Sequence, residues 1–103
     1  MYSRFLLSFF LLFSFIANSQ KVTISGYVTD KSTGENLFSC GIYVKEIKKT
    51  VYTNDYGFYS ITLDTGTYTL RVVFIGFKSF EAVAVLKKDT RLNIAMISEA
   101  SLI

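Results

Sequence analysis

Histidine and proline are both absent from this 103-residue chain, and cysteine occurs once. Without histidine the chain lacks the commonest general base and the commonest zinc ligand, which argues against a serine-type triad and a typical zinc site. A single cysteine, Cys40, leaves no partner for an internal disulfide. Stability must therefore come from packing, for which seven tyrosines and ten phenylalanines supply apolar surface.

Charged residues are also few, at 18% of the chain, and the formal net charge is only +3. The basic pairs Lys48-Lys49 and Lys87-Lys88 lie beside expected turns and are not interleaved with base-stacking aromatic residues. We therefore predict no nucleic-acid partner.

The first 19 residues differ from the rest and have the pattern of a secretory signal peptide. Arg4 supplies positive charge, residues 5–16 are apolar apart from two serines, and Ala17-Asn18-Ser19 offers small residues for a signal peptidase. We expect cleavage after Ser19, so that Gln20 begins the mature chain.

Two other interpretations of the N-terminal segment are weaker. The apolar run has about 12 residues, whereas a membrane-spanning helix needs about 20. We therefore predict no membrane span in the mature chain. A lipoprotein signal would place a cysteine directly after the apolar run. Residues 37–40 (LFSC) loosely resemble such a lipobox, but they follow an expected strand and turn.

From Lys21 onward, apolar residues recur with a period of two, which is typical of β-strands. Short strands separated by polar or glycine-containing turns predict an all-β, seven-stranded sandwich as the fold class. The expected strands cover residues 22–29, 42–45, 50–53, 58–63, 67–75, 80–86 and 92–96. No helical stretch competes with them.

Candidate catalytic residues are few. Cys40 has no histidine to activate it and begins an expected strand, which favours a buried structural thiol over a nucleophile. The acidic residues fall at separate turns, where carboxylates cap backbone amides, rather than in one cleft. They are Asp30, Glu35, Asp55, Asp64 and Asp89. We therefore predict that the chain is not an enzyme and has no catalytic, cofactor-binding or metal site.

The segment Asn54-Asp55-Tyr56-Gly57 also permits a calcium interpretation, because Asp and Asn oxygens beside a glycine suit that ion. The spacing supplies only two side-chain ligands, and a complete loop would need several more. A tight turn is the better interpretation.

Four segments together resemble carboxypeptidase-regulatory-like domains. Residues 22–30 (VTISGYVTD) and 33–37 (TGENL) are similar to the opening pattern I-x-G-x-V-x-D…T-G-E-P-L of that family. Residues 53–61 (TNDYGFYSI) resemble its T-D-x-x-G-x-Y-x-I turn. Residues 66–70 (GTYTL) and 74–78 (FIGFK) resemble its G-x-Y-x-L…G-Y-K blocks. Departures are Asn36 in place of the usual proline and residues 38–40 (FSC) in place of Pro-Gly-Ala/Val.

The resemblance implies a transthyretin-like sandwich without catalytic residues. Such domains, placed directly after a signal peptide in Bacteroidota-type bacteria, are commonly the N-terminal extension of TonB-dependent outer-membrane receptors that import nutrients. It thus implies a periplasmic location, protein partners in the import machinery, and no cofactor. Residues 97–103 are similar to those before a TonB box, so we expect a fragment that lacks the receptor's plug and barrel.

The expected organisation is a signal peptide at 1–19, the sandwich at 20–97 and the start of a linker at 98–103. An alternative function is a free-standing secreted module that binds a peptide, a glycan or a protein. Its candidate contact residues are three tyrosines expected to be exposed: Tyr27, Tyr43 and Tyr56.

Overall fold

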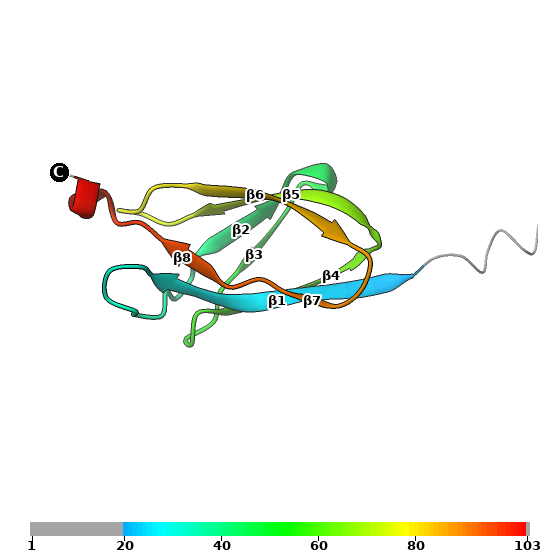
Figure 1. The fold of residues 1–103 in the computed structure, drawn as a ribbon, viewed down its shortest axis with the longest axis horizontal. Helices are drawn as coiled ribbons and strands as arrows, with labels where there is room; N and C mark the ends of the chain where they lie inside the picture. The colour runs from blue at the N-terminus through cyan, green and yellow to red at the C-terminus, as the bar shows by residue number, and fades with distance from the viewer. Residues whose placement is uncertain (1–19, 103) are drawn as a thin grey trace, which may run out of the picture.

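The computed structural model describes residues 20–102, which form two β-sheets packed against a shared core (Figure 1). The first sheet has the order β4-β1-β7, and β8 also pairs with β1. Its strands are β1 (Lys21–Asp30), β4 (Phe58–Asp64), β7 (Thr90–Arg91) and β8 (Ile94–Met96). The predicted all-β, two-layer architecture is confirmed.

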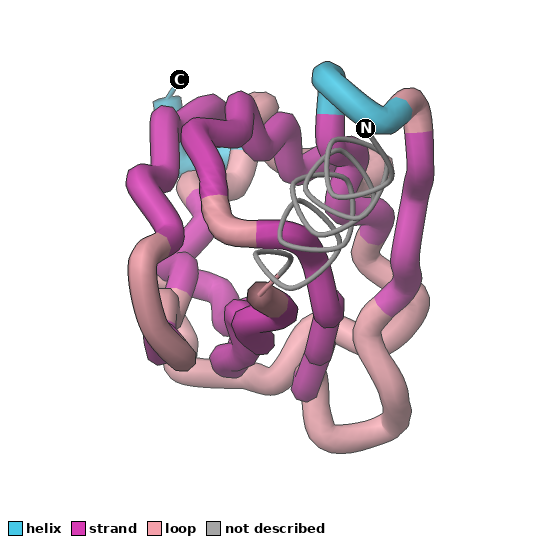
Figure 2. The backbone as a smooth tube through the Cα atoms, turned by 90° about the vertical axis from the view of Figure 1, so that its right-hand side faces the viewer, coloured by secondary structure: helices cyan, strands magenta, loops and turns pink. Residues whose placement is uncertain are grey.

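The second sheet has the order β3-β2-β5-β6, and Figure 2 shows the strands of both sheets end-on around the interior. Its strands are β2 (Gly41–Val44), β3 (Lys49–Tyr52), β5 (Gly66–Val73) and β6 (Phe80–Leu86). The helical residues in the described part belong to two short 3₁₀ segments, η2 (Lys45–Ile47) and η3 (Glu99–Leu102).

The period-two pattern places one face of each sheet in the core. Along β1 the buried side chains include Ile24 and Val28, and Ile24 lies opposite Ile61 of β4. The second sheet contributes Leu70 and Val72 from β5 in the same way. Burial of such side chains stabilises the fold by about 1.5–3 kcal/mol each.

Two predicted strands end differently in the structure. The strand expected over residues 67–75 stops at Val73, because Phe74 to Phe77 forms a turn in which the Phe77 amide donates to the Phe74 carbonyl over 3.1 Å. Gly76 adopts a φ of 86°, a left-handed conformation that glycine tolerates.

The strand expected over residues 92–96 is also corrected. The chain pairs with β1 first as β7 and then as β8, and the ladder breaks at Leu92 and Asn93. The structure therefore has eight strands in its described part, rather than the seven predicted. The transthyretin-like assignment of the sandwich stays a prediction.

Close approach to β1 explains the position of this break. A Cβ atom at Gly26 would lie 2.0 Å from the Leu92 carbonyl oxygen, so glycine alone lets the β7–β8 connection pass over β1. The Leu92 carbonyl accepts a 2.6 Å hydrogen bond from the Tyr59 hydroxyl, and the Asn93 side chain accepts one of 3.0 Å from the Tyr27 amide. These bonds replace the interrupted ladder.

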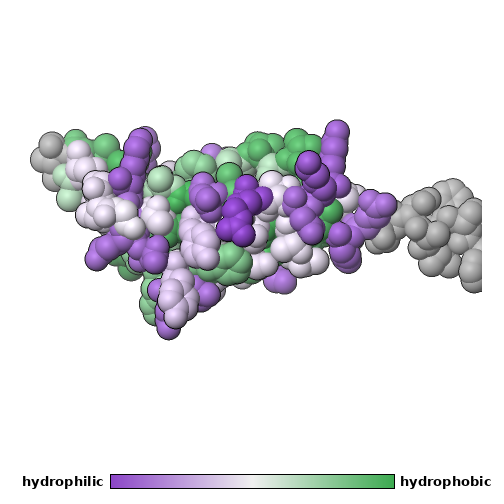
Figure 3. Space-filling model, turned by 60° about the horizontal axis from the view of Figure 1, so that its bottom comes forward, coloured by the Kyte–Doolittle hydropathy of each residue, from purple (hydrophilic) through white to green (hydrophobic). Residues whose placement is uncertain are grey.

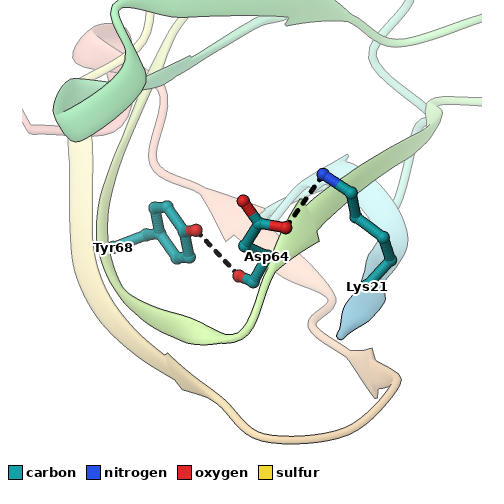
Figure 4. Close-up of polar contacts among 3 residues, drawn as sticks. All are labelled: Lys21, Asp64 and Tyr68. Carbon is teal, nitrogen blue, oxygen red and sulfur yellow. Dashed lines mark hydrogen bonds and ion pairs between the residues drawn. The ribbon is translucent and has the colours of Figure 1, made fainter. Parts of the chain in front are cut away.

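The end of the sandwich near Lys21 is held by polar contacts drawn in Figure 4. Lys21 and Asp64 are register partners on β1 and β4, and their side chains form an ion pair of 2.9 Å. The Tyr68 hydroxyl donates to the Asp64 carbonyl oxygen over 2.7 Å. The ion pair is largely exposed, so it contributes about 0–1 kcal/mol.

The predicted signal peptide, residues 1–19, lies outside the described residues. At the other end, the Glu99 amide at the start of η3 donates to the Gly76 carbonyl over 2.9 Å, and Ser98 forms a β-bridge with Phe77. The segment expected to begin a linker thus contacts the sandwich. Within residues 20–102, no helix has the length and apolar character needed to cross a membrane.

Candidate functional site

A shallow apolar groove of about 690 Å³ lies on the outer face of the second sheet. It lies between strands β2, β3 and β5 and the turn that follows β5. The larger apolar side chains that line it are Tyr43, Tyr52, Val73, Phe74, Ile75 and Phe77.

The floor of the groove is created by a glycine between two larger residues. Gly41 of β2 lies opposite Tyr52 on one side and Val73 on the other. An added Cβ atom would meet both neighbours at an ordinary 3.5 Å, so the glycine leaves space that a methyl group would occupy. Tyr52 is 65% exposed and forms one wall.

The loop before β2 is fixed by a buried threonine. The Thr53 hydroxyl donates to the Leu37 carbonyl and accepts a 2.9 Å hydrogen bond from the Cys40 amide. Ser39 has a φ of 62°, so it adopts the left-handed conformation where the related family pattern has glycine. The substituted loop therefore keeps a glycine-like turn at the groove's rim.

The opposite wall is the turn after β5. The Phe74 and Phe77 rings lie 5.6 Å apart with a 49° tilt, while Ile75 between them is 96% exposed. The Lys78 amide donates to the Ile97 carbonyl over 2.8 Å, which connects this wall to the chain after β8. The wall therefore has a fixed position, with one unpacked apolar side chain.

The residues that line the groove include no Asp, Glu, Lys or Arg. Such a surface can bind an uncharged ligand through apolar contacts and tyrosine hydroxyls. Elsewhere in residues 20–102, no three acidic, cysteine or histidine side chains gather in a way that could hold a metal ion.

Cys40 lies beneath this surface as a buried thiol, as the sequence predicted. Its Sγ atom lies 3.5 Å from the Val73 carbonyl oxygen and 3.7 Å from the Met96 sulfur. Burial raises the pKa of the Cys40 thiol from 9.0 to about 11, which disfavours the nucleophilic thiolate.

The candidate acid Asp30 and the calcium-like turn at 54–57 serve local structure. Asp30 Oδ1 accepts hydrogen bonds from the Ser32 amide and hydroxyl, and these bonds lower the pKa of Asp30. Asn54 Oδ1 accepts from the Tyr56 and Phe58 amides at 2.9 and 3.0 Å. The segment at 54–57 is thus a side-chain-stabilised turn, as predicted.

The three tyrosines proposed for binding do not form one surface. Tyr43 lies in the groove, but Tyr27 packs against Phe58 on the first sheet with ring centroids 5.3 Å apart, and Tyr56 lies on the exposed 54–57 turn. Sequence reasoning missed Tyr52. The available signal was the short β-branched segment at 50–53, in which Tyr52 has the same parity as Thr50 on the outer face.

Comparisons with known proteins agree with this fold. Bacillopeptidase F of Bacillus subtilis (strain 168) is 34% identical over 79 residues, covering 75% of this chain but only 6% of that protein. A cohesin–X-dockerin complex of Acetivibrio cellulolyticus contains a chain with a TM-score of 0.63 and 20% identity, covering 73% of this chain and 56% of that one.

A putative carbohydrate-binding protein of Bacteroides uniformis is similar in structure, with a TM-score of 0.56 and 22% identity, covering 75% of this chain and 41% of that one. At such identities the structural likeness shows the fold alone. A sequence profile of the CarboxypepD_reg-like domain matches residues 24–103. Since this match spans most of the chain and agrees with a two-sheet β-sandwich, the chain belongs to the CarboxypepD_reg-like domain family.

Proposed function

We propose that this chain is the non-catalytic periplasmic N-terminal extension domain of a TonB-dependent outer-membrane receptor for nutrient import. The observation that carries the proposal is the order of two segments. A CarboxypepD_reg-like sandwich follows directly after a stretch with the charge, apolar length and small-residue end of a secretory signal. In this role the domain works through contacts with proteins of the import machinery and needs no cofactor.

The coding DNA beyond codon 103 tests this proposal. We expect a TonB box, a plug domain and a large barrel to follow in frame. The absence of plug and barrel sequence from every downstream frame would overturn the proposal. Fractionation of cells that carry a tagged copy of the whole gene gives a second readout, because the tag is expected with the outer membrane.

A second candidate is a free-standing secreted module that binds a glycan or an apolar peptide. The groove favours it, because aromatic and aliphatic side chains with no charged neighbour line a surface of about 690 Å³. The structural likeness to a putative carbohydrate-binding protein fits the same hypothesis.

Glycan and peptide arrays distinguish this second candidate. Under it we expect a signal that Tyr52→Ser removes, because Tyr52 forms a wall of the groove. The control is Tyr56→Ser, which removes a tyrosine of similar exposure from the 54–57 turn. Equal signals from both variants, or no signal from the unmodified chain, would count against the groove as a binding site.

A further inference from the structure

Strand β6 is an edge strand of the second sheet, and in the described part of the chain one of its two sides is open. Within residues 20–102 it pairs only with β5, and it extends over seven residues without a proline. Its outer face carries Glu81, Val83 and Val85, and the two valines are 67% and 61% exposed. A long, apolar, unprotected edge of this kind is a template for another strand.

The first sheet has an edge strand of the same length with a different surface. β4 also has seven residues, but its outer face carries Ser60, Thr62 and Asp64. Polar side chains of this kind make an edge less favourable for strand addition. The two edges therefore differ in side-chain chemistry rather than in length.

The direction of the free backbone groups on β6 follows from a contact on β5. The Thr69 amide donates to Glu46 Oε1 over 2.7 Å, on the side where η2 continues from β2. In an antiparallel strand the backbone N–H and C=O of one residue point to the same neighbouring strand, and successive residues alternate between the two neighbours. The backbone groups of Tyr68 and Leu70 therefore point toward β6. The register partners of these two residues are Ala84 and Ala82, whose backbone groups form hydrogen bonds with β5.

The intervening residues of β6 consequently direct their backbone groups away from β5. Glu81, Val83 and Val85 each present one N–H and one C=O at the open edge. The same three residues carry the outward side chains, so backbone pairing and valine burial would occur together.

We infer that β6 pairs antiparallel with β6 of a second copy of this chain, across a two-fold axis at Ala84. In this register Val83 lies opposite Val85 of the second copy. Glu81 lies opposite Lys87 of the second copy, the first residue of the bend that follows β6. The two-fold axis repeats both pairs. Antiparallel neighbours of opposite charge, and paired β-branched residues, each stabilise a sheet.

Neighbouring registers are poorer in charge pairing. A shift that centres the axis on Val83 places Glu81 opposite Val85 of the second copy. Neither of the two symmetry-related Glu81–Lys87 pairs then forms. A shift that centres it on Val85 places Val83 opposite Lys87 of the second copy and leaves Glu81 without a strand partner, because Asp89 lies beyond β6 and accepts a hydrogen bond from the Thr23 amide. Registers of the other parity would not match the alternating backbone groups. The sequence of β6 and its following turn therefore selects the Ala84 register.

Sedimentation equilibrium of the chain, expressed from its full reading frame in a secreting host, tests the inference. Measurements from about 10 μM to about 1 mM cover the affinity expected of a small strand-edge interface. We expect a reversible monomer–dimer equilibrium. Amide hydrogen exchange supplies a second readout, because Val83 and Val85 amides should gain protection as the concentration rises, while the Ala82 and Ala84 amides are protected throughout.

Charge exchange identifies the register. Glu81→Lys and Lys87→Glu each create like-charged pairs, and each should raise the dimer dissociation constant about ten-fold. The double variant restores opposite charges and should return the constant to within about three-fold of the original. Glu81 also lies opposite Arg71 on β5. Glu81→Lys and the double variant change this pair in the same way, so the comparison of those two variants isolates the contact with position 87 of the second copy.

The matched controls are Glu35→Lys and Lys31→Glu, the same charge changes on an exposed turn remote in sequence from β6. They should leave the dissociation constant unchanged. A chain that stays monomeric to about 1 mM, a dimer without rescue in the double variant, or an edge that accepts only a foreign strand overturns the inference.

Discussion

The outer faces of the two sheets differ in chemistry although both sheets contribute to the same core. On the first sheet the outward residues of β1 and β4 are mostly hydroxyl-bearing or charged, and the lower side of the molecule, brought forward in Figure 3, is mostly hydrophilic. On the second sheet Tyr52, Val83 and Val85 are exposed. A small domain without disulfides has little apolar surface to spare, so exposed apolar residues point to contact with another molecule.

The first sheet, polar outside, should be the less tolerant of a small change at its backbone crossing. Gly26→Ala would place a Cβ atom 2.0 Å from the Leu92 carbonyl oxygen, which is too close for two non-bonded atoms. We expect a loss of at least about 3 kcal/mol in the free energy of unfolding, because backbone must move. Urea unfolding monitored by circular dichroism measures it.

Gly41→Ala on the second sheet is the matched control. Its added methyl group has ordinary 3.5 Å contacts, so the expected cost is under about 1 kcal/mol. Equal losses for the two variants would contradict the difference in tolerance that we assign to the two sheets.

Alkaline pH should lower the free energy of unfolding through Cys40, which is buried between the two sheets. Its folded pKa of about 11 lies above the ordinary 9.0, so the unfolded chain loses the proton first and stability falls as the pH rises from about 9 to about 11. The loss is at most about 3 kcal/mol, because one pKa unit corresponds to about 1.4 kcal/mol. Burial also raises the pKa of Tyr59, to about 12, which extends the decline in the same direction.

Unfolding curves between pH 8 and pH 11 measure this decline, and Cys40→Ala should lessen its slope. Iodoacetamide gives an independent check. The native thiol should react only at the rate at which the chain opens, and rapid labelling of the native chain would show that Cys40 is accessible.

Removal of one hydroxyl should cost more on the first sheet than on the second. Tyr59→Phe deletes the 2.6 Å hydrogen bond to the Leu92 carbonyl at the β7–β8 break, with an expected loss of about 1–2 kcal/mol. Tyr43→Phe, at the half-buried ring in the groove, should change stability by less than about 0.5 kcal/mol. Thermal unfolding of both variants measures the difference, and a larger effect at Tyr43 would reverse the assignment.

The smallest expected effect has opposite signs in the loop before β2 of the second sheet and within β4 of the first sheet. Ser39→Gly should stabilise the chain by about 0.5 kcal/mol, because a φ of 62° is unfavourable for serine and easily reached by glycine. Ser60→Gly within β4 should destabilise it by about 0.5–1 kcal/mol through the added freedom of the unfolded chain. Chemical denaturation of the two variants measures the change in the free energy of unfolding. Two changes of the same sign would show that the backbone conformation at the substituted position does not determine the effect.

Alternation of apolar residues was sufficient to predict the all-β architecture, the position of most strands and much of the core, because burial depends on each strand's own pattern. The break at Leu92 was not predictable, since it depends on the close approach of a segment far along the chain to Gly26. The groove was missed for a related reason. Tyr52 and Val73 become neighbours only through the pairing of β3 and β5 with β2, which local sequence does not specify.

The parallel pairing of β1 with β7 and β8 has a mechanical consequence. The described chain enters at one end of β1 and leaves near its other end, and Figure 1 shows these ends on opposite sides of the sandwich. Tension applied through the two ends would load the hydrogen bonds between β1 and the last strands in shear, so that many resist at once instead of opening singly. In this geometry the domain can transmit a pull along its length while its second sheet remains free to engage other molecules.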